Sequence, residues 1–383
     1  SFGIWSSYLL PAGMCHNHGS YDDVEKENSM HGGDRYRNEV NIDFSINVNP
    51  SGIAPKIQQA MQEALVWADV YPDEQCEALR EAMAKQYACE KATILCGNGA
   101  SELLLGFVRA YAPKRAVVVA PGFSGYLHAL HSISCEICYF YAKEEQAFLL
   151  DDTLLSFLEE KQPELVILTN PNNPNGALAS LNYLKKVSRC CANIGARLLV
   201  DECFIALTKE GDGASFLQES KQWNHVFILQ ALTKSMAIPG VRLGYLFCPA
   251  AKDAARIKKQ LSEWNVSVIA QKAGIAAMQI LEKKTYLEKT RTLLEAESIF
   301  LREGLQKMGC KVYPSHANFL LFYEKTIPWQ KRLLQQQILI RDCSDYEGLT
   351  AGFYRIAIRT HAENEALLLA MQKCQIEERN ERN

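Results

Sequence analysis

Short apolar runs rich in β-branched residues alternate with longer amphipathic stretches between residues 93 and 248. Runs of this kind are typical of strands buried on both faces of a sheet, and the amphipathic stretches are typical of the helices that cover those faces. The alternation therefore predicts an α/β fold with a mostly parallel sheet. The expected strands cover residues 115–120, 136–141, 164–169, 197–201, 225–230 and 242–248.

The pattern changes after about residue 250, where long helical patterns cover residues 253–282 and 285–308. Short apolar runs near residues 317–323, 337–340 and 354–358 indicate strands, and a last helix is expected around 363–374. This part of the chain predicts a second, smaller α+β domain. We expect an N-terminal arm at residues 1–50, a large domain at 51–255 and a small C-terminal domain at 256–383.

Composition narrows the class of protein and its partners. Lys and Arg total 41 and Asp and Glu total 44, so the net charge is −3 and a nucleic-acid partner is not expected. The chain lacks an apolar stretch of the roughly 18 residues that a membrane span needs. Its 13 Cys residues are most simply reduced thiols in a cytoplasmic protein. Three potential metal ligands, Cys15, His16 and His18, lie in the expected arm, where no metal site is predicted.

Polar and glycine-rich clusters follow the apolar runs, at the strand ends where ligand groups gather in open α/β sheets. Lys234 follows one run, and it is the residue type that pyridoxal phosphate chemistry needs for a Schiff base. Asp201 ends another run and could pair with a buried pyridinium nitrogen, while Asn173 could donate to the ring phenolate. These three residues predict catalytic roles for Lys234 and Asp201 and a cofactor-binding role for Asn173.

A phosphate anchor is also available. The turn GNGASE at residues 97–102 precedes a predicted helix, and backbone N–H groups at a helix N-terminus bind phosphate. We expect the phosphate-binding residues to be Gly99, Ala100, Ser101, Thr233 and Arg242, with Phe123 stacked on the cofactor ring. Singly, Asn173, Asp201 and Phe123 also fit a turn, a helix cap and a core position. Their order along the chain favours the cofactor site.

Several long motifs resemble a known family, the aspartate-aminotransferase-like pyridoxal-phosphate enzymes, from about residue 31 to residue 374. Within that family the chain resembles the branch of histidinol-phosphate aminotransferases and L-threonine O-3-phosphate decarboxylases, and the decarboxylases more closely. The motifs are HGG at His31, DFSINVNPSG from Asp43, YPD at Tyr71, LTKSMAIPGVRLGYL from Leu232, ILIRDC from Ile338 and FYRIAIRTHAEN from Phe353. The resemblance implies the pyridoxal-phosphate-dependent transferase fold, with a seven-stranded, mostly parallel sheet in the large domain.

The resemblance also implies a homodimer with shared sites, in which Tyr71 reaches the cofactor phosphate of the partner subunit. It implies that Arg341 and Arg355 hold the phosphate and the carboxylate of the substrate. His31, Asn47 and Arg359 complete the expected substrate-binding set. The chain departs from the wider family at Asn175, where Thr is usual, and at Phe204, where many aminotransferases have Tyr.

The implied activity is decarboxylation of a small phosphorylated amino acid, L-threonine O-3-phosphate, to (R)-1-amino-2-propanol O-2-phosphate in cobamide synthesis. The alternative within the branch is histidinol-phosphate aminotransferase, which breaks the Cα–H bond and releases a keto product. Sequence does not fix which Cα bond breaks, because that choice depends on how the substrate is oriented. An alternative of another class is a regulatory protein that binds pyridoxal phosphate without turnover, although no DNA-binding domain is evident in the chain.

Overall fold

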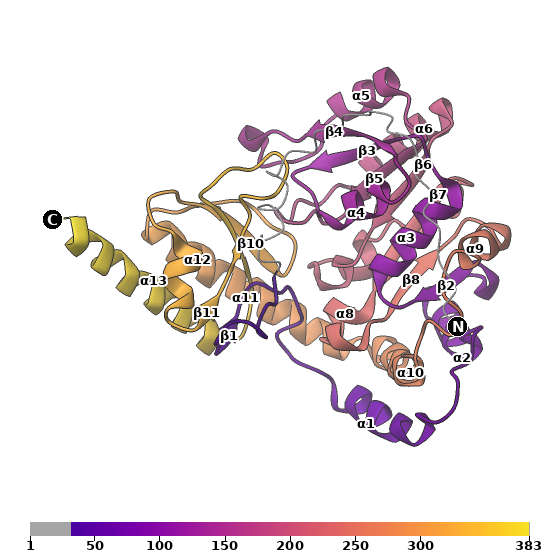
Figure 1. Ribbon diagram of the computed structural model, residues 1–383, viewed down its shortest axis with the longest axis horizontal. Helices are drawn as coiled ribbons and strands as arrows, with labels where there is room; N and C mark the ends of the chain where they lie inside the picture. The colour runs from indigo at the N-terminus through magenta and orange to yellow at the C-terminus, as the bar shows by residue number, and fades with distance from the viewer. Residues whose placement is uncertain (1–31, 383) are drawn as a thin grey trace, which may run out of the picture. The chain divides into compact units, whose positions relative to one another are not determined.

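A seven-stranded sheet forms the centre of the larger part of the molecule (Figure 1), and the computed structural model describes residues 32–382. The strand order is β2-β8-β7-β6-β5-β3-β4, and β8 is antiparallel to both of its neighbours, while the remaining pairs are parallel. The predicted mostly parallel α/β sheet is thereby confirmed. The strands are β2 (Ile94–Gly97), β3 (Arg115–Ala120), β4 (Glu136–Tyr141), β5 (Leu165–Thr169), β6 (Arg197–Asp201), β7 (Val226–Ala231) and β8 (Gly244–Phe247).

Both faces of this sheet carry a hydrophobic core, which explains why its central strands are nearly continuous apolar runs. In β6 the side chains of Leu198 and Val200 join one core, whereas Leu199 joins the core on the other face. One core also contains residues of α5 (Thr153–Lys161) and α6 (Leu181–Ile194). The other contains residues of α3 (Ala100–Tyr111), α4 (Gly125–His131) and α9 (Ala251–Lys258).

The helix predicted over residues 253–282 is wrong as a single element. The chain leaves α9 at Lys258 and begins α10 (Val268–Lys283) only after a loop. The Ser267 side chain accepts a hydrogen bond from the backbone N–H of Ala270 at 3.1 Å, so it caps a new helix. The helical periodicity of the two segments therefore hid a break. The other α-helices are α1 (Pro55–Ala64), α2 (Glu77–Tyr87), α7 (Leu217–Ser220), α8 (Leu232–Ser235), α11 (Thr285–Lys307), α12 (Trp329–Leu334) and α13 (His361–Arg382).

The C-terminal part contains a four-stranded antiparallel sheet of order β12-β13-β10-β9. Its strands are β9 (Lys311–Val312), β10 (Phe319–Tyr323), β12 (Arg341–Asp342) and β13 (Phe353–Ala357). A separate parallel pair joins β1 (Ile42–Asp43) to β11 (Ile338–Leu339), so the start of the described chain runs beside its C-terminal part (Figure 1). The expected α+β character of this region is confirmed, and the domain boundaries at residues 50 and 255 stay predictions.

The sequence also raised the questions of a metal site and of a membrane span. Cys15, His16, His18 and His31 lie outside the described residues. Within residues 32–382, no cluster of three or more His, Cys, Asp or Glu side chains could hold a metal ion. Over the same residues, none of the helices has the length and apolar character needed to cross a bilayer.

Candidate active site

Asp201 lies at the carboxyl end of β6, and its side chain is only 6% exposed. Tyr126 Oη donates a hydrogen bond to Asp201 Oδ2 at 2.8 Å, and the backbone N–H of Cys203 donates to Oδ1 at 3.0 Å. Burial raises the pKa of the Asp201 carboxyl, while the donors from Cys203 and Tyr126 oppose that shift. The site thus contains a buried carboxyl group whose charged form is stabilised by two oriented donors.

Lys234 follows the neighbouring strand β7, in the short helix α8. Burial, together with the positive charges of Arg355 and Arg242, lowers the pKa of its ammonium group to about 8. Among the described residues no hydrogen-bond partner contacts Nζ, which lies 6.0 Å from the ring centroid of Phe204. A lysine in this environment loses its proton more readily than an exposed one and is available as a nucleophilic amine.

The glycine turn before α3 is packed against Arg242. Gly99 has a φ of +82°, and a Cβ atom there would lie 2.4 Å from Nη2 of Arg242. Gly244, at the start of β8, would place a Cβ atom 2.5 Å from the backbone nitrogen of Ala100. The two glycines therefore let β8, the guanidinium and the first turn of α3 approach one another. Ser101 lies in that first turn, and Thr233 is buried beside Lys234.

The segment after β1 runs beside Lys234. The backbone N–H of Asn49 donates to the carbonyl of Lys234 at 2.9 Å, and Asn49 Nδ2 donates to the carbonyl of Ser235 at 2.8 Å. Asn47, two residues earlier, is 3% exposed, and its Oδ1 has no partner among the described residues. A buried amide oxygen without a donor is uncommon and marks Asn47 as available to a ligand.

Arg341 and Arg355 are directly opposite each other in the β12–β13 pair, and both are buried. Arg355 Nη1 donates to Oδ1 of Asn173 at 2.5 Å, and Nη2 donates to the carbonyl of Ser45 at 2.7 Å. Arg341 Nη2 donates to both carboxylate oxygens of Asp345, at 2.9 and 2.7 Å. The Arg355 guanidinium therefore brings the turn of Asn173 and the segment after β1 together with the C-terminal sheet.

Tyr346 lies between these two arginines. Its hydroxyl oxygen is 3.3 Å from Arg355 Nη1, and its ring centroid is 5.3 Å from Arg341 Cζ. Burial raises the pKa of Tyr346, and Arg355 opposes that shift. The phenol therefore stays protonated and able to donate to an anion held by the arginines.

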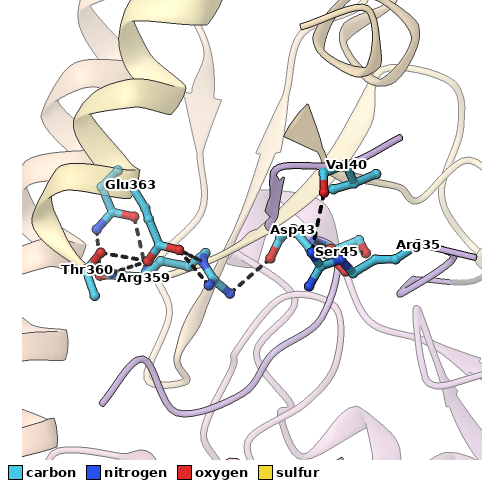
Figure 2. A network of polar contacts seen from close by, with 8 residues as sticks. Arg35, Val40, Asp43, Ser45, Arg359, Thr360 and Glu363 are labelled. Atoms are coloured by element: carbon cyan, nitrogen blue, oxygen red, sulfur yellow. Dashed lines mark hydrogen bonds and ion pairs between the residues drawn. The ribbon is translucent and has the colours of Figure 1, made fainter. Parts of the chain in front are cut away.

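Arg359 is held by protein groups (Figure 2). Its Nε and Nη2 donate to Oε1 of Glu363 at 3.0 and 2.7 Å, and its Nη1 donates to the carbonyl of Asp43 at 3.1 Å. Thr360 also donates to Glu363, through Oγ1 at 2.6 Å. Arg359 thus fixes the end of β1 close to where Arg355 holds Ser45. A direct contact of Arg359 with substrate stays a prediction.

Two aromatic residues of the predicted site are more exposed. Phe123 is 36% exposed and packs edge-on against Tyr126, with ring centroids 5.5 Å apart. Tyr71 is 76% exposed, and its ring lies 4.8 Å from that of Trp264. Phe123 therefore adjoins the donor to Asp201, whereas Tyr71 is exposed and packs on Trp264.

Sequence reasoning missed Tyr126, Tyr346, Asp345 and Ser45. Tyr126 had a usable signal, because it follows Phe123 by three residues and so lies on the same side of a helical turn. Tyr346 and Asp345 follow Arg341 in a loop, and no periodicity marks them. Their contacts depend on how β12 and β13 pair.

Comparison with known proteins identifies the family of the chain. The family model of aminotransferase class I and II matches residues 39–371. The threonine-phosphate decarboxylase of Salmonella typhimurium is 35% identical, over 86% of this chain and 90% of that protein. The L-serine phosphate decarboxylase of Sulfurospirillum multivorans is 29% identical, over 79% and 78% of the two chains.

A solved structure has a similar fold. The histidinol-phosphate aminotransferase of Clostridium acetobutylicum superposes with a TM-score of 0.80 and 28% identity, over 88% of this chain and 99% of that one. The family model and the relatives cover nearly all of the described residues, and the strand order carries Lys234, Asp201 and Asn173 to one edge of the sheet. The chain belongs to the aminotransferase class I and II family.

Proposed function

We propose that the protein is a pyridoxal-phosphate-dependent decarboxylase of L-threonine O-3-phosphate, with (R)-1-amino-2-propanol O-2-phosphate as its product for cobamide synthesis. The observation that carries this proposal is the pair of buried arginines, Arg341 and Arg355, directly opposite each other on β12 and β13. Like charges opposite each other in a sheet are unfavourable, and a substrate with both a phosphate and a carboxylate compensates them. The similarity to a threonine-phosphate decarboxylase supports the same substrate class.

The residues fit pyridoxal phosphate. The absence of a Cβ atom at Gly99 leaves room beside Arg242, where the turn of Ala100 and Ser101 and the hydroxyl of Thr233 would hold the phosphate. Asp201, Asn173 and Phe123 would hold the ring, and Lys234 Nζ has no competing hydrogen bond within residues 32–382. When bound, pyridoxal phosphate would stabilise the negative charge that forms at the substrate Cα.

The protein groups determine which bond breaks at Cα. Arg355 would fix the substrate carboxylate and Arg341 its phosphate, and this two-point hold would orient the carboxylate bond for cleavage. CO2 then leaves and a proton takes its place at Cα. Lys234 can deliver that proton, because burial brings its pKa to about 8.

The second candidate activity is transamination of histidinol phosphate, which the similarity to the Clostridium acetobutylicum structure favours. Histidinol phosphate carries a phosphate but no carboxylate, so with its phosphate on Arg341 it would leave Arg355 without an anionic partner. Arg355 makes its hydrogen bonds to Asn173, Tyr346 and the Ser45 carbonyl and to no carboxylate among the described residues. Its unbalanced charge favours the substrate that supplies a carboxylate.

The test is a substrate comparison with the purified protein and added pyridoxal phosphate. L-threonine O-3-phosphate should give CO2 and an amino alcohol phosphate without a keto acid. L-serine O-phosphate, tested in parallel, shows how much the methyl group of threonine contributes to substrate selectivity. A requirement for 2-oxoglutarate, with consumption of histidinol phosphate and no CO2, would replace this proposal with the aminotransferase.

We also propose that the enzyme works as a homodimer. The segment from Leu65 to Tyr71 exposes five large apolar side chains, namely Leu65, Val66, Trp67, Val70 and Tyr71, each more than half exposed. A contiguous apolar patch of this kind is typical of a protein–protein interface. A second copy of the chain would cover the patch and carry Tyr71 toward the phosphate site. Sedimentation equilibrium should therefore give twice the chain mass.

A further inference from the structure

A basic hollow lies at the end of the large sheet opposite the candidate active site. Its volume is about 700 Å³, which is within the range of small-molecule sites. Arg197 lines the hollow and begins β6, whereas Asp201 ends the same strand, about 13 Å further along. The end of α6, the start of α9 and Tyr111 at the end of α3 complete the wall, and α3 and α9 pack side by side (Figure 1). The hollow is therefore separate from the groups that would hold the cofactor and the substrate.

Three basic side chains line this hollow, those of Arg197, Lys252 and Arg256. None of the three forms an ion pair within residues 32–382. Asp253 is the one acidic residue in the described lining, and His225 adds no charge near neutral pH because burial lowers its pKa. The lining thus carries two positive charges in excess, although the whole chain has a net charge of −3. A recess with one sign of charge concentrates ions of the opposite sign.

Tyr111 fixes two of these cations. The Cζ atoms of Arg197 and Arg256 lie 4.1 and 4.6 Å from the centroid of its ring. A guanidinium stacked on a ring keeps the N–H groups at its edge free to donate to an anion. Arg256 is fixed further, because its Nε donates to the carbonyl of Ala110 at 2.9 Å. Tyr111 Oη donates to Oδ1 of Asp253 at 2.6 Å, so that carboxylate is occupied by the phenol and leaves both guanidinium groups to a ligand.

Two helix ends meet at the rim of the hollow. Ala250 is the N-cap residue of α9 and has no side chain that caps the helix, and N–H groups that begin a helix lack an intrahelical partner. At the end of α6 the carbonyl groups are already used. The backbone N–H of Ala196 donates to the carbonyl of Cys191 at 2.9 Å, and that of Gly195 donates to the carbonyl at position 192 at 3.3 Å. The partial positive charge at the start of α9 therefore adds to that of the three basic side chains.

We propose that this hollow is a second anion site, which binds a small phosphate monoester. A phosphate monoester carries about two negative charges near neutral pH and so matches the excess charge of the lining, whereas a single carboxylate supplies one. The guanidinium edges of Arg197 and Arg256 donate parallel pairs of hydrogen bonds to phosphate oxygens, and Lys252 adds a positive charge. The hollow shares no residue with the candidate active site, so its occupation does not depend on the proposed reaction.

The test is isothermal titration of the holoenzyme with inorganic phosphate, in a phosphate-free buffer of low ionic strength. Arg341→Gln serves as the background, because it removes the proposed binding of the substrate phosphate at the active site. Phosphate should still bind in that background, and Arg197→Gln added to it should lower the affinity by roughly 10- to 100-fold through lost hydrogen bonds to a charged group. Arg189→Gln is the matched control, since Arg189 is an exposed arginine of α6 outside the hollow. Absence of binding, or an equal loss in Arg189→Gln and Arg197→Gln, would overturn the proposal.

Asp253→Asn in the otherwise wild-type chain provides the opposite test. It removes the one negative charge of the described lining and keeps an oxygen that accepts from Tyr111 Oη, so phosphate should bind severalfold more tightly. Two esters then test the charge of the ligand. Methyl phosphate should bind like inorganic phosphate, whereas dimethyl phosphate, with a single negative charge, should bind more than tenfold more weakly. Unchanged affinity in Asp253→Asn, or equal affinity for the two esters, would contradict a phosphate monoester site.

Discussion

Arg341 and Arg355 occupy directly opposite positions of β12 and β13, yet their charge environments differ. Arg341 is paired with the carboxylate of Asp345, whereas Arg355 donates to the Asn173 amide, the Tyr346 hydroxyl and the Ser45 carbonyl. The fold thus holds a buried guanidinium against neutral acceptors. A buried charge of this kind is costly until an anion compensates it, which makes Arg355 the stronger of the two anchors for the substrate carboxylate.

Arg355→Gln should weaken substrate binding much more than it changes the fold. A hydrogen bond to a charged group contributes about 1.5–3 kcal/mol, so KM for L-threonine O-3-phosphate should rise by roughly 10- to 100-fold. Steady-state kinetics provides the measurement. Arg332→Gln is the matched control, since Arg332 is a partly buried arginine of α12 that is paired with Glu378 on α13. An unchanged KM in Arg355→Gln would show that the substrate carboxylate binds elsewhere.

Lys234→Met should stabilise the cofactor-free protein in a pH-dependent way. The pKa of Lys234 is about 8 in the fold, against an ordinary value of 10.5, so the unfolded chain binds more protons between these values. The unfavourable contribution of the charged lysine is therefore full below about pH 8 and disappears as the pH rises toward 10.5. Urea unfolding of both proteins at pH 7, 8.5 and 10 should show a stability difference that shrinks with pH. A constant difference would contradict a depressed pKa.

Tyr126→Phe should raise the pKa of Asp201, because the variant removes the hydroxyl that donates to its Oδ2 at 2.8 Å. Asp201 would then hold a proton at higher pH, and the acidic limb of the kcat profile should move to higher pH. Titration of the cofactor absorbance against pH gives a second readout.

Asp201→Asn should abolish most activity while it leaves cofactor affinity nearly intact. Equal losses of affinity and activity in Asp201→Asn would make Asp201 a binding residue only.

The proposed sharing of sites between subunits predicts complementation. Tyr71→Ala and Lys234→Ala should each be inactive as homodimers, whereas their heterodimer contains one intact site. An equal mixture after subunit exchange should therefore recover about a quarter of wild-type activity, for randomly assorted dimers. The absence of recovery, with exchange demonstrated by native mass spectrometry, would place both residues in the site of one subunit.

The sequence predicted the strands of the large sheet well because both faces are buried. Strands β3, β4 and β6 begin and end at the expected residues, where apolar runs meet turn-formers or polar residues. The direction of β8 was not predictable, since an apolar strand looks the same whichever way it runs. The break between α9 and α10 was missed because the helical spacing continues across the loop, and only Ser267 signals the new helix.

The residues of the candidate site also fall into a group that the sequence predicts and a group that it does not. Lys234, Asp201 and Asn173 were found because each follows a strand, and strand ends converge by topology. The hydrogen bond from Arg355 to Asn173 spans 182 residues and joins two sheets, so no local pattern encodes it. The roles of Tyr126 and Tyr346 likewise depend on packing, because a tyrosine in a helix or a loop is more often an ordinary structural residue.

In the proposed reaction the bond from Cα to the carboxylate breaks while the Cα–H bond survives. Deuterium placed at Cα of L-threonine O-3-phosphate reports this directly. With the purified enzyme, pyridoxal phosphate and no keto acid, the account predicts CO2 release and full retention of the deuterium at C1 of the amino alcohol phosphate, measured by mass spectrometry. Loss of the deuterium to solvent with formation of a keto product and no CO2 would contradict it.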